Sequence, residues 1–250
     1  MIFSVSTHSV RGILLDIEGT TTPIEFVYRV LFPFVRERLQ DYLTQNATSE
    51  DFRQDITVLR QDYLVDVSQN LAPPPWTDDK PTDFNIESIA AYVHWLMDRD
   101  RKSTGLKLLQ GKIWQKGYLA GELKGRVFPD VPTALARWSE MNLDVRIFSS
   151  GSVLAQKLLF ANTEFGDLTK FLRGYFDPTF GSKISEDSYR RIASEFRLPP
   201  SEILFISDTP RELDAAKAAG MQSLLCARHG SETRSTTHGQ GVISSFDEII

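Results

Sequence analysis

Two carboxylates, Asp16 and Glu18, stand where a short apolar run gives way to glycine and threonines, in the stretch VRGILLDIEGTTT of residues 10–22. The run over residues 10–15 is short and rich in branched side chains, which predicts a buried strand. Both acids then follow the carboxyl end of that strand, where open α/β sheets bind their ligands. Acids two positions apart point to the same side of an extended chain and repel each other, so we expect a cation or a shared proton beside them.

A carboxylate in such a place can attack phosphorus and form an aspartyl phosphate, which makes Asp16 a candidate nucleophile. Glu18 could then act as the general acid and base. Taken alone, an aspartate is more often a turn or cap residue, and a glutamate is more often a solvated loop acid. The three threonines of residues 20–22 could bind phosphate or simply form a turn before Pro23.

Three further places in the chain could complete this chemistry. Ser149 and Ser150 precede a helical pattern, where hydroxyl and free backbone N–H groups either bind an anion or cap the helix. Lys183, in FGSKISEDSY, could offset the charge of a phosphate and of the attacking acid, although a lone lysine is usually a surface residue. Asp208 could join Asp16 in holding a hard divalent cation such as magnesium, which takes carboxylate and water oxygens.

Predicted strands must position three of these residues. Short apolar runs over residues 13–15, 145–148 and 203–206 end before Asp16, Ser149 and the pair Ser207-Asp208, and a fourth run covers residues 223–226. Amphipathic helical patterns, among them residues 133–141 and 153–162, separate the later runs. This alternation predicts an α/β protein with a mostly parallel sheet and helices on both faces. Because parallel strands end at one edge of a sheet, Asp16, Ser149 and Asp208 should meet there.

The helix after Asp208 has the most complete sequence signals. Thr209 suits the N-cap, Pro210 the first helical position and Glu212 the third, which predicts a T-x-x-E capping box. Gly220 suits the end of the helix. Glu212 could instead act as an acid behind the site, but the local pattern favours capping. Residues 228–241 indicate a surface loop, and residues 244–250 could add a last short helix.

Between the first strand and the rest of the sheet, the hydrophobic pattern becomes mostly helical. One apolar stripe crosses Pro33, which could bend it or start a new helix, and another begins near Asn85, which suits an N-cap. The two stripes are Val27, Leu31, Val35, Leu39 and Leu43, and Ile89, Val93, Leu96 and Met97. We therefore expect a helical cap domain over residues 23–125, inserted into a core domain of residues 1–22 and 126–250.

Composition and charge argue against several function classes. With a net charge of −5 over 250 residues, the chain lacks the basic excess typical of nucleic-acid-binding proteins. No apolar run approaches the length of a membrane span, and the N-terminus has no secretory signal pattern, so we expect no membrane partner. Cys226 is the only cysteine, which excludes an internal disulfide and fits a reducing, cytosolic compartment. The four histidines lack metal-ligand spacing, and neither a Walker loop nor a G-x-G-x-x-G stretch is present.

The order of acid, serine, lysine and acid resembles the haloacid-dehalogenase superfamily of phosphohydrolases. Most phosphatases of that superfamily carry Asp-x-Asp in the first motif, whereas this chain has Asp16-Ile17-Glu18. The string DIEGTTTPIEFV, followed by LFPFVRERL, is similar to the enolase-phosphatase (acireductone synthase) family of methionine salvage, in which the glutamate is usual. The segments IWQKGYLAGELKG, FPDV, IFSSGS, GSKISEDSY and ISDTPRELDAAKAAGM extend the resemblance over residues 13–221.

This resemblance implies a Rossmannoid core with an inserted helical cap, and a cytoplasmic, monomeric, magnesium-dependent enzyme. The family enolises 2,3-diketo-5-methylthiopentyl 1-phosphate, a small phosphorylated diketone, and then removes the phosphate to give the acireductone. By resemblance, Asp16 is the nucleophile and a magnesium ligand, and Glu18 moves protons and joins the metal site through its backbone carbonyl. Ser149 and Ser150 hold substrate, Lys183 binds the phosphate, and Asp208 completes the metal shell.

Three alternatives remain open from the sequence. A phosphatase of the same superfamily could act on another small phosphorylated metabolite, because the fold does not determine the substrate. A non-catalytic binding protein on this fold would be expected to lack Asp16, Lys183 or Asp208, yet all three are present. Dehalogenation fits poorly, because a second acid beside Asp16 suits phosphate and magnesium better than an apolar halide pocket.

Overall fold

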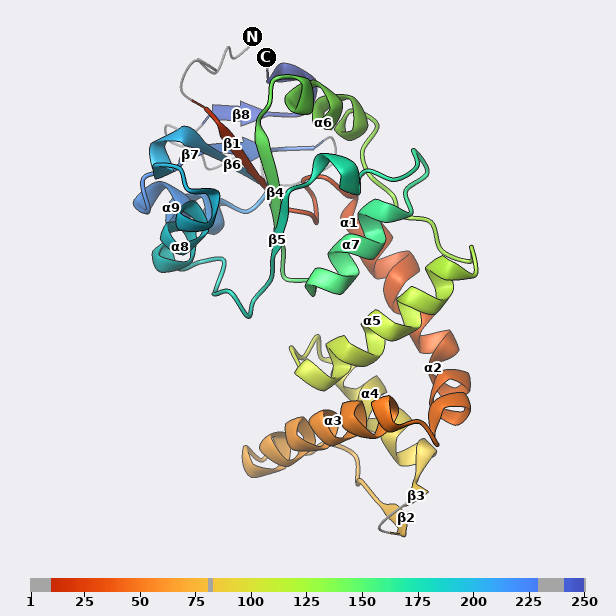
Figure 1. Cartoon of the computed structure of the whole chain (residues 1–250). Helices are drawn as coiled ribbons and strands as arrows, with labels where there is room; N and C mark the ends of the chain where they lie inside the picture. Colours follow the sequence, from red (N-terminus) through yellow and green to blue (C-terminus); the bar gives the residue numbers. More distant parts are fainter. Residues whose placement is uncertain (1–9, 81–82, 229–240, 250) are drawn as a thin grey trace. The chain divides into compact units, whose positions relative to one another are not determined.

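The computed structural model describes residues 10–80, 83–228 and 241–249, which form two compact units (Figure 1). The first unit comprises Met1–Phe26 and Lys124–Ile250, and the second comprises Val27–Leu123. All six candidate site residues named from the sequence lie in the first unit. None of the helices in the described part of the chain combines the length and the apolar character that crossing a lipid bilayer requires.

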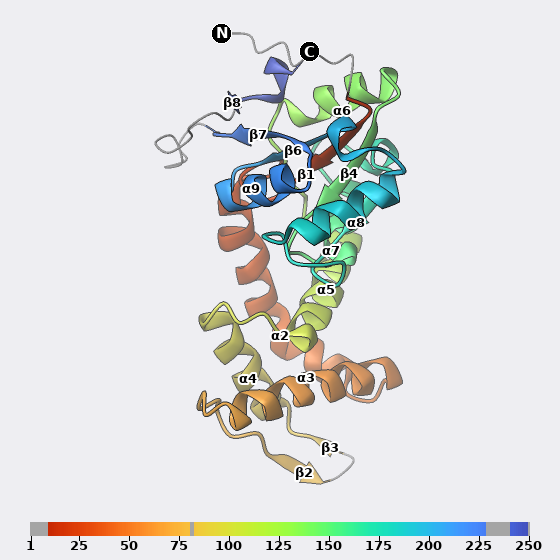
Figure 2. The same cartoon turned by 90° about the vertical axis from the view of Figure 1, so that its left-hand side faces the viewer.

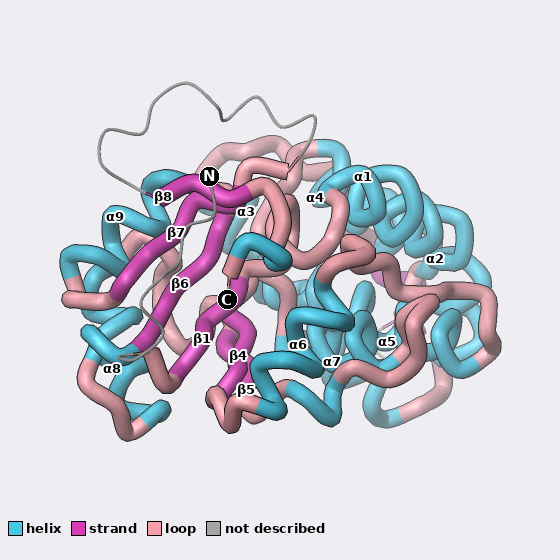
Figure 3. The backbone as a smooth tube through the Cα atoms, turned by 90° about the horizontal axis from the view of Figure 1, so that it is seen from above, coloured by secondary structure: helices cyan, strands magenta, loops and turns pink. Residues whose placement is uncertain are grey.

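The first unit is built on a six-stranded sheet in the order β5-β4-β1-β6-β7-β8, and every neighbouring pair is parallel (Figures 1 and 3). Its strands are β1 (Gly12–Leu15), β4 (Asp144–Phe148), β5 (Gly174–Phe176), β6 (Ile203–Ser207), β7 (Gln222–Cys226) and β8 (Gly241–Ile243). The predicted α/β architecture with a parallel sheet is therefore confirmed. Leu15 pairs with Ile147 on one side and Ile206 on the other, so β1, β4 and β6 end at the same level.

Helices cover both faces of this sheet, with α8 (Glu186–Phe196) and α9 (Pro210–Ala218) on one face and α6 (Val131–Glu140) and α7 (Val153–Ala161) on the other (Figure 3). A buried cluster joins Leu14, Phe148 and Phe205 of the strands to Tyr189 of α8 and Leu213 of α9. Strands covered on both faces have to be apolar along their whole length, which explains the uninterrupted apolar runs in the sequence. Short helical turns complete the unit: α1 (Ile24–Phe26), η2 (Thr169–Phe171), η3 (Pro200–Glu202) and η5 (Phe246–Glu248).

The predicted ends of several elements need correction. Thr209 occupies the N-cap position of α9, but its side chain makes no capping hydrogen bond, so the predicted capping box with Glu212 is wrong. Gly220 follows this helix with φ of +92°, as predicted for a terminating glycine. The predicted surface loop is contradicted at both ends, because Arg228 is buried and Gly241 begins β8, while residues 229–240 lie outside the described residues. The last predicted helix is the single turn η5.

The second unit is mostly helical and contains η1 (Val27–Leu31, a π-helical segment), α2 (Phe32–Asn46), α3 (Glu50–Ser68), α4 (Ile86–Asp98) and α5 (Thr104–Leu119). Pro33 lies at the start of α2, directly after η1, so the π-helical segment immediately precedes the proline in a helical stretch that runs without a break over residues 24–46. Asn85 caps α4 by accepting a hydrogen bond from the Ser88 N–H, as predicted. Gly105 allows α5 to lie against the backbone of α3, since a Cβ there would overlap Leu59.

A small antiparallel ribbon of β2 (Asp78–Lys80) and β3 (Asp83–Phe84) lies beside α3 (Figures 1 and 2). The ring of Phe84 packs edge-on against Phe52 of α3, with 5.7 Å between the ring centroids. The sequence pattern indicated neither this ribbon nor α3 and α5 individually.

Candidate active site

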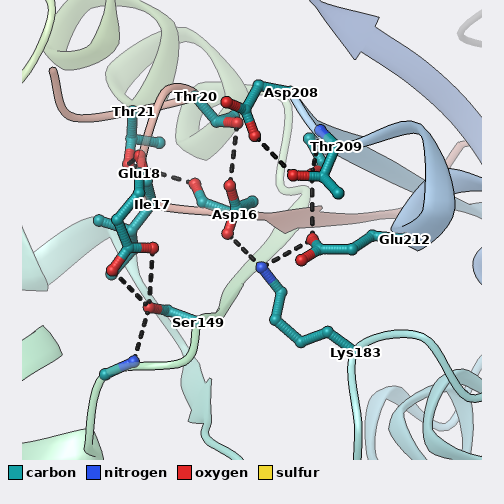
Figure 4. A network of polar contacts seen from close by, with 12 residues as sticks. Asp16, Ile17, Glu18, Thr20, Thr21, Ser149, Lys183, Asp208, Thr209 and Glu212 are labelled. Carbon is teal, nitrogen blue, oxygen red and sulfur yellow. Dashed lines mark hydrogen bonds and ion pairs between the residues drawn. The ribbon is translucent and has the colours of Figure 1, made fainter. Parts of the chain in front are cut away.

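Asp16 lies directly after β1, and its side chain is almost completely buried (Figure 4). Lys183 Nζ donates to one carboxylate oxygen, and the Thr20 hydroxyl donates to the other at 3.2 Å. A carboxylate held from both sides keeps a fixed orientation, which a nucleophile needs for an in-line attack. The central position of β1 in the sheet explains why the edge for ligands forms around this residue.

The loop after Asp16 is held by its own backbone. The backbone N–H groups of Thr20, Thr21 and Thr22 all approach the carbonyl of Ile17, at 2.9 to 3.1 Å. The Thr21 hydroxyl donates to the carbonyls of Asp16 and Ile17, so this side chain serves the loop itself. The sequence left open whether the threonines form a turn or bind phosphate. The hydrogen bonds support the turn, with Thr20 touching the Asp16 carboxylate.

Glu18 and Ser149 form the second part of the site. The Ser149 hydroxyl lies 3.2 and 3.4 Å from the two oxygens of the Glu18 carboxylate, and it accepts a hydrogen bond from the Gly151 N–H at 3.0 Å. Burial and then the nearby charge of Asp16 raise the pKa of Glu18 above its usual range. A carboxyl group with a raised pKa takes up a proton more readily than an ordinary one, which suits an acid–base catalyst. Ser150 lies in the same loop, next to Ser149.

Lys183 reaches between two acids, Asp16 and Glu212, and the second lies 2.7 Å from Nζ (Figure 4). Burial by itself lowers the pKa of Lys183, but the charges of these two acids raise it above its usual range, so the ammonium form is favoured. The Tyr189 hydroxyl donates to the backbone carbonyl of Lys183 and fixes the segment that carries the lysine.

Glu212 therefore belongs to the site and not to a helix cap. Its carboxylate accepts hydrogen bonds from Lys183 and, at 3.0 Å, from the Ser207 hydroxyl. Burial and then the charge of Asp16 raise the pKa of Glu212 to about 7. The sequence pattern favoured capping over this role, because a T-x-x-E pattern is the same whichever way the glutamate side chain turns.

Asp208, directly after β6, completes the cluster. The Thr209 hydroxyl donates to its carboxylate at 3.0 Å, and burial and then the charge of Asp16 raise the pKa of Asp208 to about 6. Gly19, with φ of +76°, lies against this carboxylate so closely that a Cβ would overlap it. The loop after Asp16 is thus shaped to let a second carboxylate approach.

The donor set of this cluster suits magnesium. Asp16 and Asp208 offer only oxygen atoms, and burial together with the charge of Asp16 raises the pKa of Asp208, as expected where a cation is needed to balance the charge. Within the described ranges, no group of three or more His, Cys, Asp or Glu side chains has the arrangement of a metal site. Magnesium does not require one, because it usually takes one or two carboxylates and keeps several waters or substrate oxygens.

The chain is similar to known proteins over nearly its whole length. A family model of haloacid dehalogenase-like hydrolases matches residues 10–220. Enolase-phosphatase E1 of Synechococcus elongatus is 46% identical over 243 residues, which make up 96% of this chain and 98% of that protein. The chain belongs to the enolase-phosphatase E1 family. The family and the hydrolase class predicted from the sequence are therefore confirmed.

A longer relative and a solved structure are also similar to this chain. A relative from Vitis vinifera, named "Probable bifunctional methylthioribulose-1-phosphate dehydratase/enolase-phosphatase E1 1", is 44% identical over 96% of this chain, which corresponds to 47% of that longer protein. The solved structure of the UTR4 protein from Saccharomyces cerevisiae is 32% identical, with a TM-score of 0.76, and the match covers 95% of this chain and 99% of that one. This chain therefore shares its fold with a solved structure over nearly its whole length.

The structure brings together Asp16, Glu18, Ser149, Lys183 and Asp208, and it places Ser150 in the same loop. Their individual roles in the reaction stay predictions. Sequence reasoning placed Glu212 outside the site, and it did not distinguish Thr20 from the other threonines. For Thr20, a hydroxyl four residues after the acid was the available signal, because a tight turn returns that side chain to the carboxylate.

Proposed function

We propose that this enolase-phosphatase converts 2,3-diketo-5-methylthiopentyl 1-phosphate, by way of an enol phosphate, into 1,2-dihydroxy-3-keto-5-methylthiopentene and phosphate in methionine salvage. The observation that carries the proposal is Glu18, with its raised pKa, beside the buried Asp16 in a chain of this family. The Vitis vinifera relative is named as a probable bifunctional protein, with a methylthioribulose-1-phosphate dehydratase and an enolase-phosphatase in one chain. Removal of water from such a sugar phosphate gives a diketone phosphate, which is the substrate class proposed here.

Enolisation requires a base next to the carbon that loses the proton, and Glu18 is our candidate. It takes the proton from the carbon that bears the phosphate ester, the electron pair moves to the neighbouring ketone oxygen, and the Glu18 carboxyl passes the proton to that oxygen to give the enol. The Ser149 hydroxyl, within hydrogen-bond distance of both Glu18 oxygens, orients the carboxylate for this transfer. We propose that Ser149 and Ser150 also contact the substrate.

Phosphate removal begins when an Asp16 oxygen attacks phosphorus and the bond to the enol oxygen breaks, which leaves an aspartyl phosphate. A proton from solvent restores the Glu18 carboxyl, which protonates the departing oxygen and then takes a proton from the water that hydrolyses the aspartyl phosphate. The ammonium group of Lys183 stabilises the phosphoryl oxygens, while Glu212 keeps it charged and in place.

Asp16, Asp208 and the backbone carbonyl of Glu18 would hold magnesium, which when bound polarises oxygens of the substrate and offsets the charge of phosphoryl transfer. We propose that the second unit, residues 27–123, is a cap domain that excludes water while the enol is present. The sequence domain prediction placed these boundaries at residues 23 and 125. A cytoplasmic location and a monomeric state follow from the family resemblance and remain part of the proposal.

The proposal is tested by mixing enzyme, magnesium and the diketone phosphate and following ultraviolet absorbance together with phosphate release. An enol phosphate should appear first and phosphate should follow. A panel of simple phosphate esters serves as the comparison. Strong turnover of sugar phosphates without enolisation of the diketone would contradict the proposal and favour a phosphatase for a different metabolite.

A further inference from the structure

Arg228 lies two residues beyond the end of β7, and only 6% of its surface is exposed. Its Nε and one terminal nitrogen both donate to the backbone carbonyl of Thr20, at 3.0 and 2.7 Å. The other terminal nitrogen donates to Asp130 at 2.6 Å and to the Ser244 carbonyl at 3.3 Å. A single buried side chain therefore links the loop after Asp16 to α6 and to the C-terminal segment.

Two aromatic rings also hold the guanidinium group. It lies over the rings of Phe128 and Phe246, 4.3 and 4.6 Å from their centroids. Its partner Asp130 also accepts hydrogen bonds from the Ser245 hydroxyl at 3.1 Å and from the Phe246 N–H at 2.6 Å. Arginine suits this place because its planar fork can bond one carbonyl twice while its faces stack on aromatic rings.

The position of the Thr20 carbonyl affects Asp16 directly, because the hydroxyl of the same residue donates to the Asp16 carboxylate. The neighbouring Thr21 carbonyl is held independently by the Phe128 N–H at 2.9 Å. The aromatic residue that supports Arg228 thus also supports the loop. Movement of the Thr20 backbone would displace a hydrogen-bond donor of the nucleophile.

We propose that Arg228 is a positioning residue of this enzyme, which acts through the Thr20 carbonyl to hold the loop after Asp16 in its reactive geometry. Asp130 orients Arg228 for this purpose. The catalytic part of this inference rests on the proposed function, whereas its structural part concerns the loop alone. The order of the loop and the rate of the reaction are therefore measured separately.

The test compares Arg228→Lys with Arg146→Lys. Arg146 is a matched control, because it also pairs with a carboxylate, Asp144, at 2.8 Å and stacks on a ring, Phe196, at 4.4 Å. None of its interactions with described residues involves the loop after Asp16. Both variants keep the charge and lose the planar fork.

We expect amide hydrogen exchange in the peptide covering residues 16–22 to accelerate about tenfold or more in Arg228→Lys and to stay unchanged in Arg146→Lys. At a temperature where both are folded, kcat for the diketone phosphate should fall about 10- to 100-fold in Arg228→Lys, with KM changed less than about threefold. If Arg228→Lys does not fold, Asp130→Asn takes its place, with smaller changes expected in the same direction.

Equal exchange of residues 16–22 in both variants would overturn the inference, as would a loss of kcat that merely follows the loss of thermal stability. If wild-type enzyme does not turn over the diketone phosphate while the exchange results hold, the proposed function fails and the positioning of the loop stands. The kcat comparison is then made with a phosphate ester that the wild-type enzyme does hydrolyse.

Discussion

At the scale of single residues, Asp16 and Glu18 lie in one loop but have different surroundings, and we propose different roles for them. Asp16 is held by Lys183 and Thr20, whereas Glu18 meets the Ser149 hydroxyl and has a raised pKa. The first arrangement suits attack on phosphorus and the second suits proton transfer. Substitution of Asp16 should therefore leave enol formation largely intact, whereas substitution of Glu18 should impair both activities.

Glu18→Gln keeps the shape of the side chain and removes its ability to carry a proton. We expect enol formation to fall about 100-fold or more, since general acid–base catalysis contributes at least this much. Enol formation and phosphate release should be measured separately, by absorbance and by a phosphate assay. Unchanged rates of both steps would remove Glu18 from the mechanism.

Asp16→Asn removes the nucleophile and leaves Glu18 in place. Phosphate release should fall about 1000-fold or more, as expected when a covalent nucleophile is lost. Enol formation should fall less, so the enol phosphate accumulates and is visible by absorbance. Normal phosphate release by this variant would contradict the assignment of Asp16.

At the scale of elements, the loop between β1 and α1 depends on the backbone of Gly19. Gly19→Ala places a methyl group against the Asp208 carboxylate in a backbone conformation that costs about 1–2 kcal/mol for an alanine. We expect a loss of stability of that size together with a loss of phosphatase activity of about 100-fold. Thermal melting and steady-state kinetics would measure the two effects.

Gly166→Ala is the matched control for this loop. Gly166 also has a positive φ, of +85°, but no described atom lies within 4 Å of a Cβ built there. Its substitution should cost a similar amount of stability and leave activity unchanged. If both variants lose activity equally, the approach of Asp208 to the loop is not what Gly19 provides.

The elements also show where sequence reasoning succeeds. The strands before Asp16, Ser149 and Asp208 were predictable, because buried parallel strands leave continuous apolar runs and their ends are where ligands bind. Strands β5 and β8 have three residues each, too few to produce a recognisable pattern. Arg228 was not predictable, since its partners Thr20 and Asp130 are 208 and 98 residues away in the sequence.

At the scale of the whole molecule, the acids of the site link stability to pH and to metal. Burial and the charge of Asp16 raise the pKa of Asp208 from 3.8 to about 6 and that of Glu212 from 4.5 to about 7. Each group therefore binds its proton more tightly in the folded than in the unfolded protein. Its contribution to stability is present at low pH and is lost as pH rises from about 4 to about 7.

We therefore expect the melting temperature in a chelating buffer to fall between pH 5 and pH 8 by more than it does in Asp208→Asn. Magnesium should raise the melting temperature more at pH 8 than at pH 5, because a cation competes with protons for carboxylate oxygens. Calorimetry with and without magnesium at both pH values measures this. An equal effect of magnesium at both pH values would show that these acids do not bind it.

The first unit contains residues from both ends of the chain, with the second unit inserted between them. This order has a consequence for synthesis on the ribosome. Strand β1 lies between β4 and β6, so one of its edges stays unpaired until Phe148 has emerged and the other until Ser207 has emerged. The helical unit can fold meanwhile, since the contacts among α2, α3, α4 and α5 are all within it. Asp16 is thus synthesised early, but the strands that surround it in the sheet follow late. We therefore expect chaperones to bind the unpaired edges of β1 during translation.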